Sequence, residues 1–168
     1  KHSITGAVEI IGQAMATDTP DTWDNPVNLV GAEMTRRAAS QVYQEASVGP
    51  HEVDVVELHD CFTVNEVITY EGLGLCDEGE ATALVDAGDN TYGGKFVVNP
   101  SGGLMSKGHP IGASGAAQIV ELTEQLRGRA HHRQVENARI GLAHNGGGMI
   151  GTDAAATVVS ILLREGRS

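Results

Sequence analysis

One glycine-rich segment of the sequence carries a single histidine in a setting suited to catalysis. Residues 99–115 read NPSGGLMSKGHPIGASG, in which His109 is followed by Pro110. Glycine lets the backbone approach other groups closely and adopt positive φ, and proline restricts φ, so this segment is expected to hold one imidazole in a fixed place. From Gly112 to about Gly128 the apolar residues recur as in a largely buried helix. His109 would then lie at the amino end of a helix, where free N–H groups favour an anionic intermediate.

Two further segments place a histidine beside a cysteine or glycine. His59-Asp-Cys61 directly follows residues 53–58, a short apolar segment typical of a strand inside a sheet covered on both faces. His144-Asn-Gly146 follows a second such segment, residues 139–143. Since ligands gather outside the carboxyl ends of strands in open α/β sheets, the three histidine segments could converge on one pocket. A thiol, imidazoles and glycine N–H groups are the components of acyl transfer.

Each segment also has an ordinary structural interpretation. A lone histidine in a glycine-rich stretch is more often part of a surface loop than of a catalytic site. Residues 144–148, which read HNGGG, are expected to form a tight glycine turn and fit a plain hairpin between two strands.

The elements expected around these segments give an α/β order without internal repeats. Strands are predicted over residues 8–13, 53–58, 96–98, 139–143 and 154–163, and helices over residues 28–46, 64–73 and 112–128. Asn28 is expected to cap the first helix. Residues 17–26 are expected to form a polar loop in which Trp23 plugs the core, and residues 77–95 a long connection that is functional or faces a partner.

Composition excludes several classes of function. The net charge of -11, with 22 acidic against 11 basic residues, argues against non-specific nucleic-acid binding, and 4% aromatic residues leave little for base stacking. No apolar run approaches the roughly 20 residues of a membrane span. The spacing of Cys61 and Cys76 does not fit a zinc site, so no metal is predicted. No secretory signal is visible, which favours the cytoplasm or an organelle matrix such as that of peroxisomes or mitochondria.

The ordered segments strongly resemble motifs of the thiolase superfamily. Residues 108–115 resemble its Gly-His-Pro loop. His59-Asp-Cys-Phe62 resembles the sterol-carrier-protein type of thiolase, in which this sequence replaces Asn-Glu-Ala-Phe. The similarity runs through nearly all 168 residues, including the sequences GLGLC at 72–76, GDNTYGGK at 88–95 and NPSGG at 99–103. It implies the carboxyl-terminal half of a thiolase, an α/β domain with a mixed sheet covered by helices on both faces.

The resemblance also implies roles for individual residues. His109 would activate the nucleophilic cysteine and help bind the thioester oxygen. His59 would replace the asparagine that completes this first oxyanion site with a water molecule. Cys61 would be the second catalytic thiol, which exchanges protons with the acetyl-CoA carbon. Gly146, next to Asn145, would supply a backbone N–H to the second oxyanion site.

Other positions depart from the family pattern or complete it. Ser106, Gly108 and Ser114 are expected to contact substrate, with coenzyme A as a substrate and no bound cofactor. Ordinary thiolases carry an acid/base cysteine where this chain has His144. The nucleophilic Cys-x-Ser loop of the amino-terminal half does not occur in this sequence, and Cys76 is expected to pack as a small hydrophobe.

The expected activity is thiolytic cleavage of a 3-ketoacyl-CoA to a shortened acyl-CoA and acetyl-CoA or propionyl-CoA, in lipid or sterol breakdown. Residues 1–168 are expected to be one thiolase C-terminal domain that partners a nucleophile-bearing half or complementary subunit and forms a homo-oligomer. Such a half should expose apolar surface. Two alternatives stay open: retro-aldol cleavage of a β-hydroxyacyl-CoA, which needs no nucleophilic cysteine, and a non-catalytic subunit that binds acyl-CoA or sterol.

Overall fold

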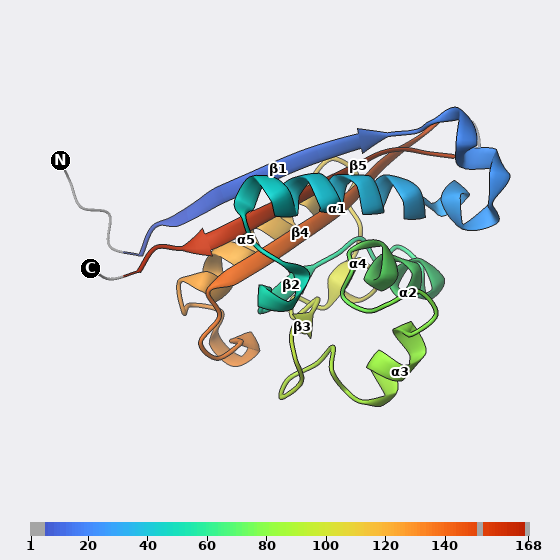
Figure 1. Cartoon of the computed structure of the whole chain (residues 1–168). Coiled ribbons are helices and arrows are strands. Elements are labelled where there is room, and N and C mark those ends of the chain that lie inside the picture. The colour runs from blue at the N-terminus through green and yellow to red at the C-terminus, as the bar shows by residue number, and fades with distance from the viewer. Residues whose placement is uncertain (1–5, 151–152, 167–168) are drawn as a thin grey trace.

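A five-stranded mixed sheet forms the centre of the protein, described here from a computed structural model for residues 6–150 and 153–166 (Figure 1). The strands are β1 (Val8–Thr17), β2 (Val55–Glu57), β3 (Val97–Val98), β4 (Ile140–Ile150) and β5 (Asp153–Arg164). Their order is β1-β5-β4-β2-β3. The strands β1, β5 and β4 pair antiparallel, whereas β2 lies parallel to both β4 and β3. The carboxyl ends of β2 and β4 therefore lie at the same edge.

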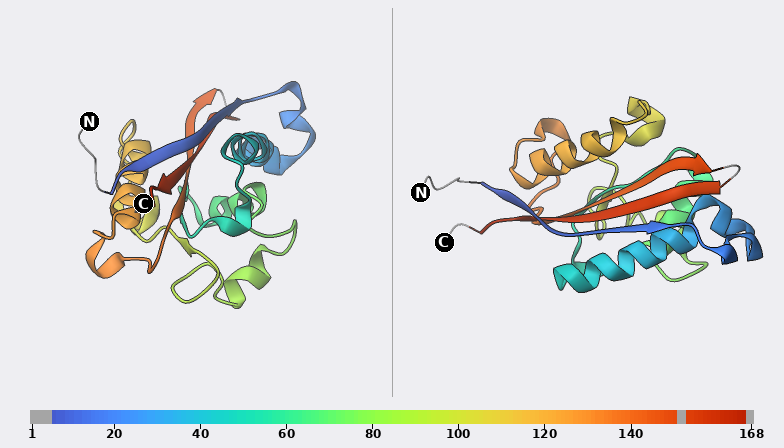
Figure 2. Two further views of the ribbon diagram at one scale, coloured as in Figure 1. Left: turned by 60° about the vertical axis from the view of Figure 1, so that its left-hand side comes forward. Right: turned by 90° about the horizontal axis from the view of Figure 1, so that it is seen from above.

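Helices cover both faces of this sheet, as the resemblance implied. They are α1 (Ala32–Ala46), α2 (Thr63–Gly72), α3 (Ala81–Asp86), α4 (Gly103–Lys107) and α5 (Ser114–Leu126). In the view from above in Figure 2, α1 lies on one side of the strands and α5 on the other. Among residues 6–150 and 153–166, no helix has the length and apolar character needed to cross a bilayer.

Each face of the sheet has its own apolar core. Val42 of α1 packs in one cluster with Ile161 of β5. Leu122 of α5 packs in a second cluster with Leu162 of β5 and Val55 of β2. Successive residues of a strand point to opposite faces, so the neighbours Ile161 and Leu162 enter different clusters. This arrangement explains why the central strands read as continuous apolar segments.

The prediction of a tight glycine turn at residues 144–148 is wrong. These residues lie inside β4, which pairs with β5 from Ile140 opposite Leu163 to Ile150 opposite Asp153. Gly146 and Gly147 pair with Thr157 and Ala156, and Gly148, with φ at +68°, is left out of the register before pairing resumes at Met149, so the chain continues as a strand although glycine is rare there. The consequence for the site is that His144 lies within the sheet rather than at a turn.

Three smaller predictions near the first helix are also wrong. The polar segment contains two 3-10 helices, Pro20–Asp24 and Pro26–Val30, each begun by a proline whose fixed φ suits a first helical position. Helix α1 starts only at Ala32, after Gly31 in the left-handed conformation (φ 86°), so Asn28 does not cap it. Trp23 is 65% exposed and does not plug the core.

The long connection predicted at residues 77–95 contains the short helix α3.

Candidate active site

The three histidine segments meet around His59, which follows β2 at the carboxyl edge of the sheet. The rings of His59 and His109 contact edge to face, with centroids 4.9 Å apart and planes at 87°. On the other side, the backbone N–H of His59 donates to Nδ1 of His144 at 3.3 Å. A Cβ placed on Gly146 would lie 3.5 Å from the His59 ring, so this glycine lies directly against the imidazole. The structure thus brings together the residues that the sequence had placed on separate segments.

His109 is exposed and is oriented by a buried serine. Its Nδ1 lies 2.7 Å from Oγ of Ser114, whose hydroxyl is also 3.3 Å from the carbonyl oxygen of Pro110. When Ser114 donates to Pro110, it accepts the Nδ1 proton of His109 and leaves Nε2 as a proton acceptor. Ser114 was predicted as a substrate contact, but at 4% exposure it is placed to orient His109. Ser106 and Gly108, the other two predicted contacts, are exposed on the same segment.

His144 is buried and uses both ring nitrogens. Because Nδ1 accepts from the His59 backbone, Nε2 carries the proton and donates to Oγ1 of Thr35 at 3.0 Å. Burial, and secondarily the nearby His59, lower the pKa of His144 to about 3. The ring is therefore neutral near pH 7 and serves as a support for His59, with no free nitrogen to act as acid or base.

Burial also shapes the ionisation of His59 and Cys61. The pKa of His59 is lowered by burial first and by His109 second, while Asp60 opposes the shift. Nδ1 of His59 is buried without a hydrogen-bond partner in the described part of the chain. Cys61 is a partly exposed free thiol just before α2, and burial raises its pKa. A thiol with a raised pKa stays protonated near pH 7, as a proton donor requires.

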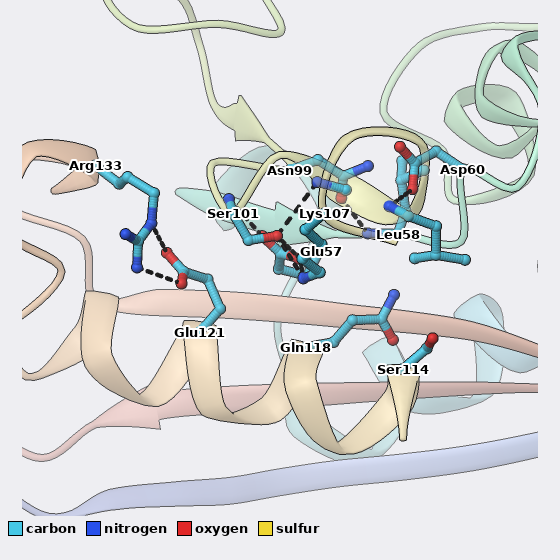
Figure 3. A network of polar contacts seen from close by, with 12 residues as sticks. Glu57, Leu58, Asp60, Asn99, Ser101, Lys107, Ser114, Gln118, Glu121 and Arg133 are labelled. Atoms are coloured by element: carbon cyan, nitrogen blue, oxygen red, sulfur yellow. Dashed lines mark hydrogen bonds and ion pairs between the residues drawn. The ribbon is translucent and has the colours of Figure 1, made fainter. Parts of the chain in front are cut away.

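A buried glutamate connects the end of β2 to the glycine-rich segment (Figure 3). The carboxylate of Glu57, which is fully buried, accepts hydrogen bonds from the Ser101 backbone at 3.1 Å and the Ser101 hydroxyl at 2.7 Å. It also pairs with Nζ of Lys107 at 3.2 Å. Burial raises the pKa of Glu57, and the bonds from Ser101 and Lys107 work against this rise. Sequence reasoning assigned Glu57 no role, although an acidic residue inside an apolar strand was a usable signal.

Two more side chains strengthen this connection. Oδ1 of Asp60 accepts from the Leu104 backbone at 2.6 Å, at the start of α4. Oδ1 of Asn99 accepts from the Leu58 backbone at 2.8 Å. The segments 57–60 and 99–107 are therefore fixed to each other by side chains from both, and with them His59 and His109.

Helix α5 holds the segment after His144. The side chain of Gln118 is fully buried, donates to the carbonyl oxygen of His144 at 3.0 Å and accepts from Nδ2 of Asn145 at 3.1 Å. Gly115 lies beside Asn145, since a Cβ placed on it would be 3.4 Å from the Asn145 amide carbon. Asn145 and Gly146, predicted for the second oxyanion site, are thus rigidly supported. Within the described residues, no group of three His, Cys, Asp or Glu side chains could hold a metal ion.

Comparison with known families decides the classification of the chain. The model of the family "Thiolase C-terminal domain-like" matches residues 15–162. The chain belongs to this family. The resemblance inferred from the three segments is therefore confirmed.

Relatives of this thiolase C-terminal domain include proteins with sterol-carrier and thiolase names. It is 54% identical to sterol carrier protein 2 of Rattus norvegicus over 161 residues, which are 94% of this chain and 29% of that protein. It is 46% identical to benzoylsuccinyl-CoA thiolase subunit BbsB of Thauera aromatica, over 74% of this chain and 33% of that one. It is 45% identical to an acetyl-CoA acetyltransferase of Methanothermobacter thermautotrophicus, over 76% and 33%. The chain thus spans about a third or less of these relatives.

A solved structure shares the fold. The chain named "Ltp2-ChsH2(DUF35) aldolase" superposes with a TM-score of 0.76 at 21% identity, covering 93% of this chain and 40% of that one. At this identity the likeness shows the fold of the thiolase C-terminal domain and nothing about its reaction.

Proposed function

We propose that this chain supplies one half of the active site of a CoA-dependent acyltransferase that cleaves 3-ketoacyl-CoA by thiolysis. The observation that carries the proposal is the contact between His59 and His109, with Nδ1 of His109 held by the Ser114 hydroxyl. Nε2 of His109 is an acceptor when this hydroxyl donates to Pro110. The printed names of two relatives, a thiolase subunit and an acetyltransferase, agree with this chemistry.

The nucleophilic cysteine would come from an amino-terminal thiolase half or a complementary subunit. Exposed apolar side chains flank the proposed catalytic residues along the chain: Phe62 is 73% exposed and Val64 66%, close after Cys61, and Ile111 is 97% exposed, close after His109. Large exposed apolar side chains near a site are typical of a contact area. A partner that covers them would bring its cysteine to the acceptor nitrogen of His109.

In the proposed cycle, Nε2 of His109 accepts the proton of the partner's thiol, and the resulting thiolate attacks the 3-keto carbon of the substrate. The bond between the substrate's α and β carbons breaks, the acyl group stays on the partner's cysteine, and the departing CoA thioester leaves as a carbanion. The thiol of Cys61 protonates that carbanion. As a thiolate, Cys61 then removes the proton of a coenzyme A thiol, whose sulfur attacks the acyl-cysteine and releases the shortened acyl-CoA. The displaced cysteine thiolate takes back the proton held on His109. Neutral His59 and the region of Gly146 would stabilise the oxygen anions.

A comparison of the two cysteines of this chain tests the assignment. Cys61→Ala in the intact protein should lower kcat for thiolysis by about 10²- to 10⁴-fold, the usual contribution of a general acid/base. Cys76→Ala is the matched control, because Cys76 packs at the edge of an apolar cluster and should leave kcat unchanged. Equal rates for the two variants would show that Cys61 has no part in proton transfer.

Retro-aldol cleavage of a β-hydroxyacyl-CoA is the second candidate. Such a step needs a base but no acyl-cysteine, and the exposed imidazole of His109, held at Nδ1 by Ser114, could serve as that base. Mass spectrometry of the acid-quenched intact protein with its partner separates the two reactions. An acyl adduct on a cysteine supports thiolysis, whereas turnover of a β-hydroxyacyl-CoA without any adduct supports the aldolase.

A further inference from the structure

A hollow of about 420 Å³ lies at the end of the sheet opposite to the histidines. Four arginines line it: Arg127 and Arg129 after α5, Arg139 before β4, and Arg164 at the end of β5. This is the end at which the arrow of β5 ends in Figure 1. His144 lies five positions after Arg139 in the chain, which is about 17 Å at about 3.4 Å per residue. The hollow is therefore separate from the proposed acyl-transfer site.

The charge in this hollow is unusual for the molecule. The chain has a net charge of -11, yet four of its eleven basic residues line this one feature. None of the four forms an ion pair with another described residue, whereas Arg36, Lys95, Lys107 and Arg133 each pair with a carboxylate. Glu165 is the single acidic residue in the lining. The hollow thus carries an excess of positive charge.

Packing of the fold accounts for only part of this cluster. The carboxyl end of α5 favours a cation, and Nε of Arg127 also donates to the carbonyl oxygen of Gly6 at 3.1 Å. Arg139 and Arg164 have no such explanation. Arg139 directly precedes β4 and Arg164 ends the neighbouring strand β5, and the Arg164 backbone N–H donates to the Arg139 carbonyl oxygen at 2.9 Å. Like charges side by side on adjacent strands destabilise a sheet, and a bound anion would remove that cost.

We propose that the four arginines form a binding site for a small molecule that bears two or more phosphate groups, of the class of a nucleoside diphosphate. The planar guanidinium matches phosphate oxygens with paired hydrogen bonds. Several arginines around one hollow suit a ligand with several negative charges, and the volume lies within the usual range of about 300–1,000 Å³ for small-molecule sites. This site is independent of the acyl-transfer chemistry, so the proposal does not depend on the proposed function.

Calorimetric titration of the intact protein with inorganic pyrophosphate and with ADP tests this site at constant ionic strength. Binding of either ligand is expected, with affinity that falls as salt is added. Equal affinities would support a site that reads phosphate alone, and a preference for ADP would support one in which the hollow also accepts the nucleoside. If neither ligand binds, the proposal is overturned.

Variants locate the binding. The double variant Arg139→Gln/Arg164→Gln keeps every backbone hydrogen bond and should bind at least tenfold more weakly. Arg36→Gln is the matched control, because Arg36 pairs with Glu33 on α1 and should leave binding unchanged. Unfolding curves without ligand check that the double variant is folded, and Arg129→Gln repeats the test if it is not. Binding by the folded variants within twofold of the wild type would overturn the proposal.

Discussion

Replacing Thr35 by valine tests whether His144 supports the site through its hydrogen bonds. Valine nearly preserves the shape of threonine but removes the oxygen that accepts the His144 Nε2 proton at 3.0 Å. Thr35 is 3% exposed and His144 is likewise buried, so the N–H loses its partner without gaining water. An unsatisfied buried donor costs about 1–3 kcal/mol, and the unfolding free energy should fall by this amount.

The same substitution should also lower the catalytic rate. In the valine variant the His59 backbone N–H still keeps the proton on Nε2, and this proton has no acceptor. The ring can reach another acceptor only by moving, which would pull Nδ1 away from the His59 backbone, so kcat for thiolysis should fall together with stability. Binding of substrate through other residues would be less affected, so the loss should appear mainly in kcat.

Urea unfolding and steady-state kinetics measure both effects. The urea midpoint should decrease while the slope of the free energy against urea stays constant, because the unfolded surface is the same. Thr123→Val on α5 is the matched control: its hydroxyl donates only to the Ile119 carbonyl within the helix, at 2.7 Å, and its loss should cost less than about 0.5 kcal/mol. If the two variants had the same midpoint and the same kcat, the supporting role of His144 would be refuted.

Three further outcomes follow from the described contacts. Because the folded-state pKa of His144 is lowered to about 3, the unfolded chain takes up this proton first. The contribution of this group to the free energy of unfolding is complete above about pH 6.5, and below that pH it decreases by about 1.4 kcal/mol per pH unit. His144→Asn should reduce this dependence of the unfolding free energy on pH, measured by urea titration at several pH values. An unchanged dependence would contradict the prediction. Ser114→Ala should lower kcat about tenfold with little change in KM, because Nδ1 of His109 loses its hydrogen-bond partner. An unchanged kcat would mean that another group orients the ring. Gly103→Ala should destabilise the protein by more than about 1 kcal/mol, since φ is +63° and the new Cβ would meet the Asp60 carboxylate. Gly128→Ala, with φ +70° and open space, measures the backbone strain alone, and equal losses of stability would exclude the clash.

Elements with a strong apolar pattern were predictable from the sequence. The four-residue spacing of Val30, Met34, Ala38 and Val42 predicted the first helix. The last three side chains are buried in α1, whereas Val30 ends the preceding 3-10 helix and is 46% exposed. The segment 144–148 was wrongly predicted as a turn, because glycine occurs in turns more often than inside strands. The segment is a strand because it pairs with β5, which follows later in the chain. The local sequence pattern carries no information about this pairing.

The candidate site was likewise only partly predictable from the sequence. Histidine, cysteine and glycine identified the segments of His59, His109 and Gly146, and the structure brings these residues together. The supports were missed, because Glu57 binds a serine 44 positions later in the chain. The catalytic roles of Cys61 and the histidines stay predictions, as does the single-domain boundary over residues 1–168.

The connection between Glu57 and Asp60 on one side and residues 99–107 on the other has a consequence for divergence within the family. These bonds join the two segments directly and bypass residues 61–98, a stretch that includes α2, α3 and the long connection. Changes of length or sequence at residues 77–95 therefore leave the spacing of the two histidines intact, since loop length adds only slowly to the cost of closing a loop. Evolution could alter this connection, and with it the neighbouring surface, while the chemistry of His59 and His109 stayed the same.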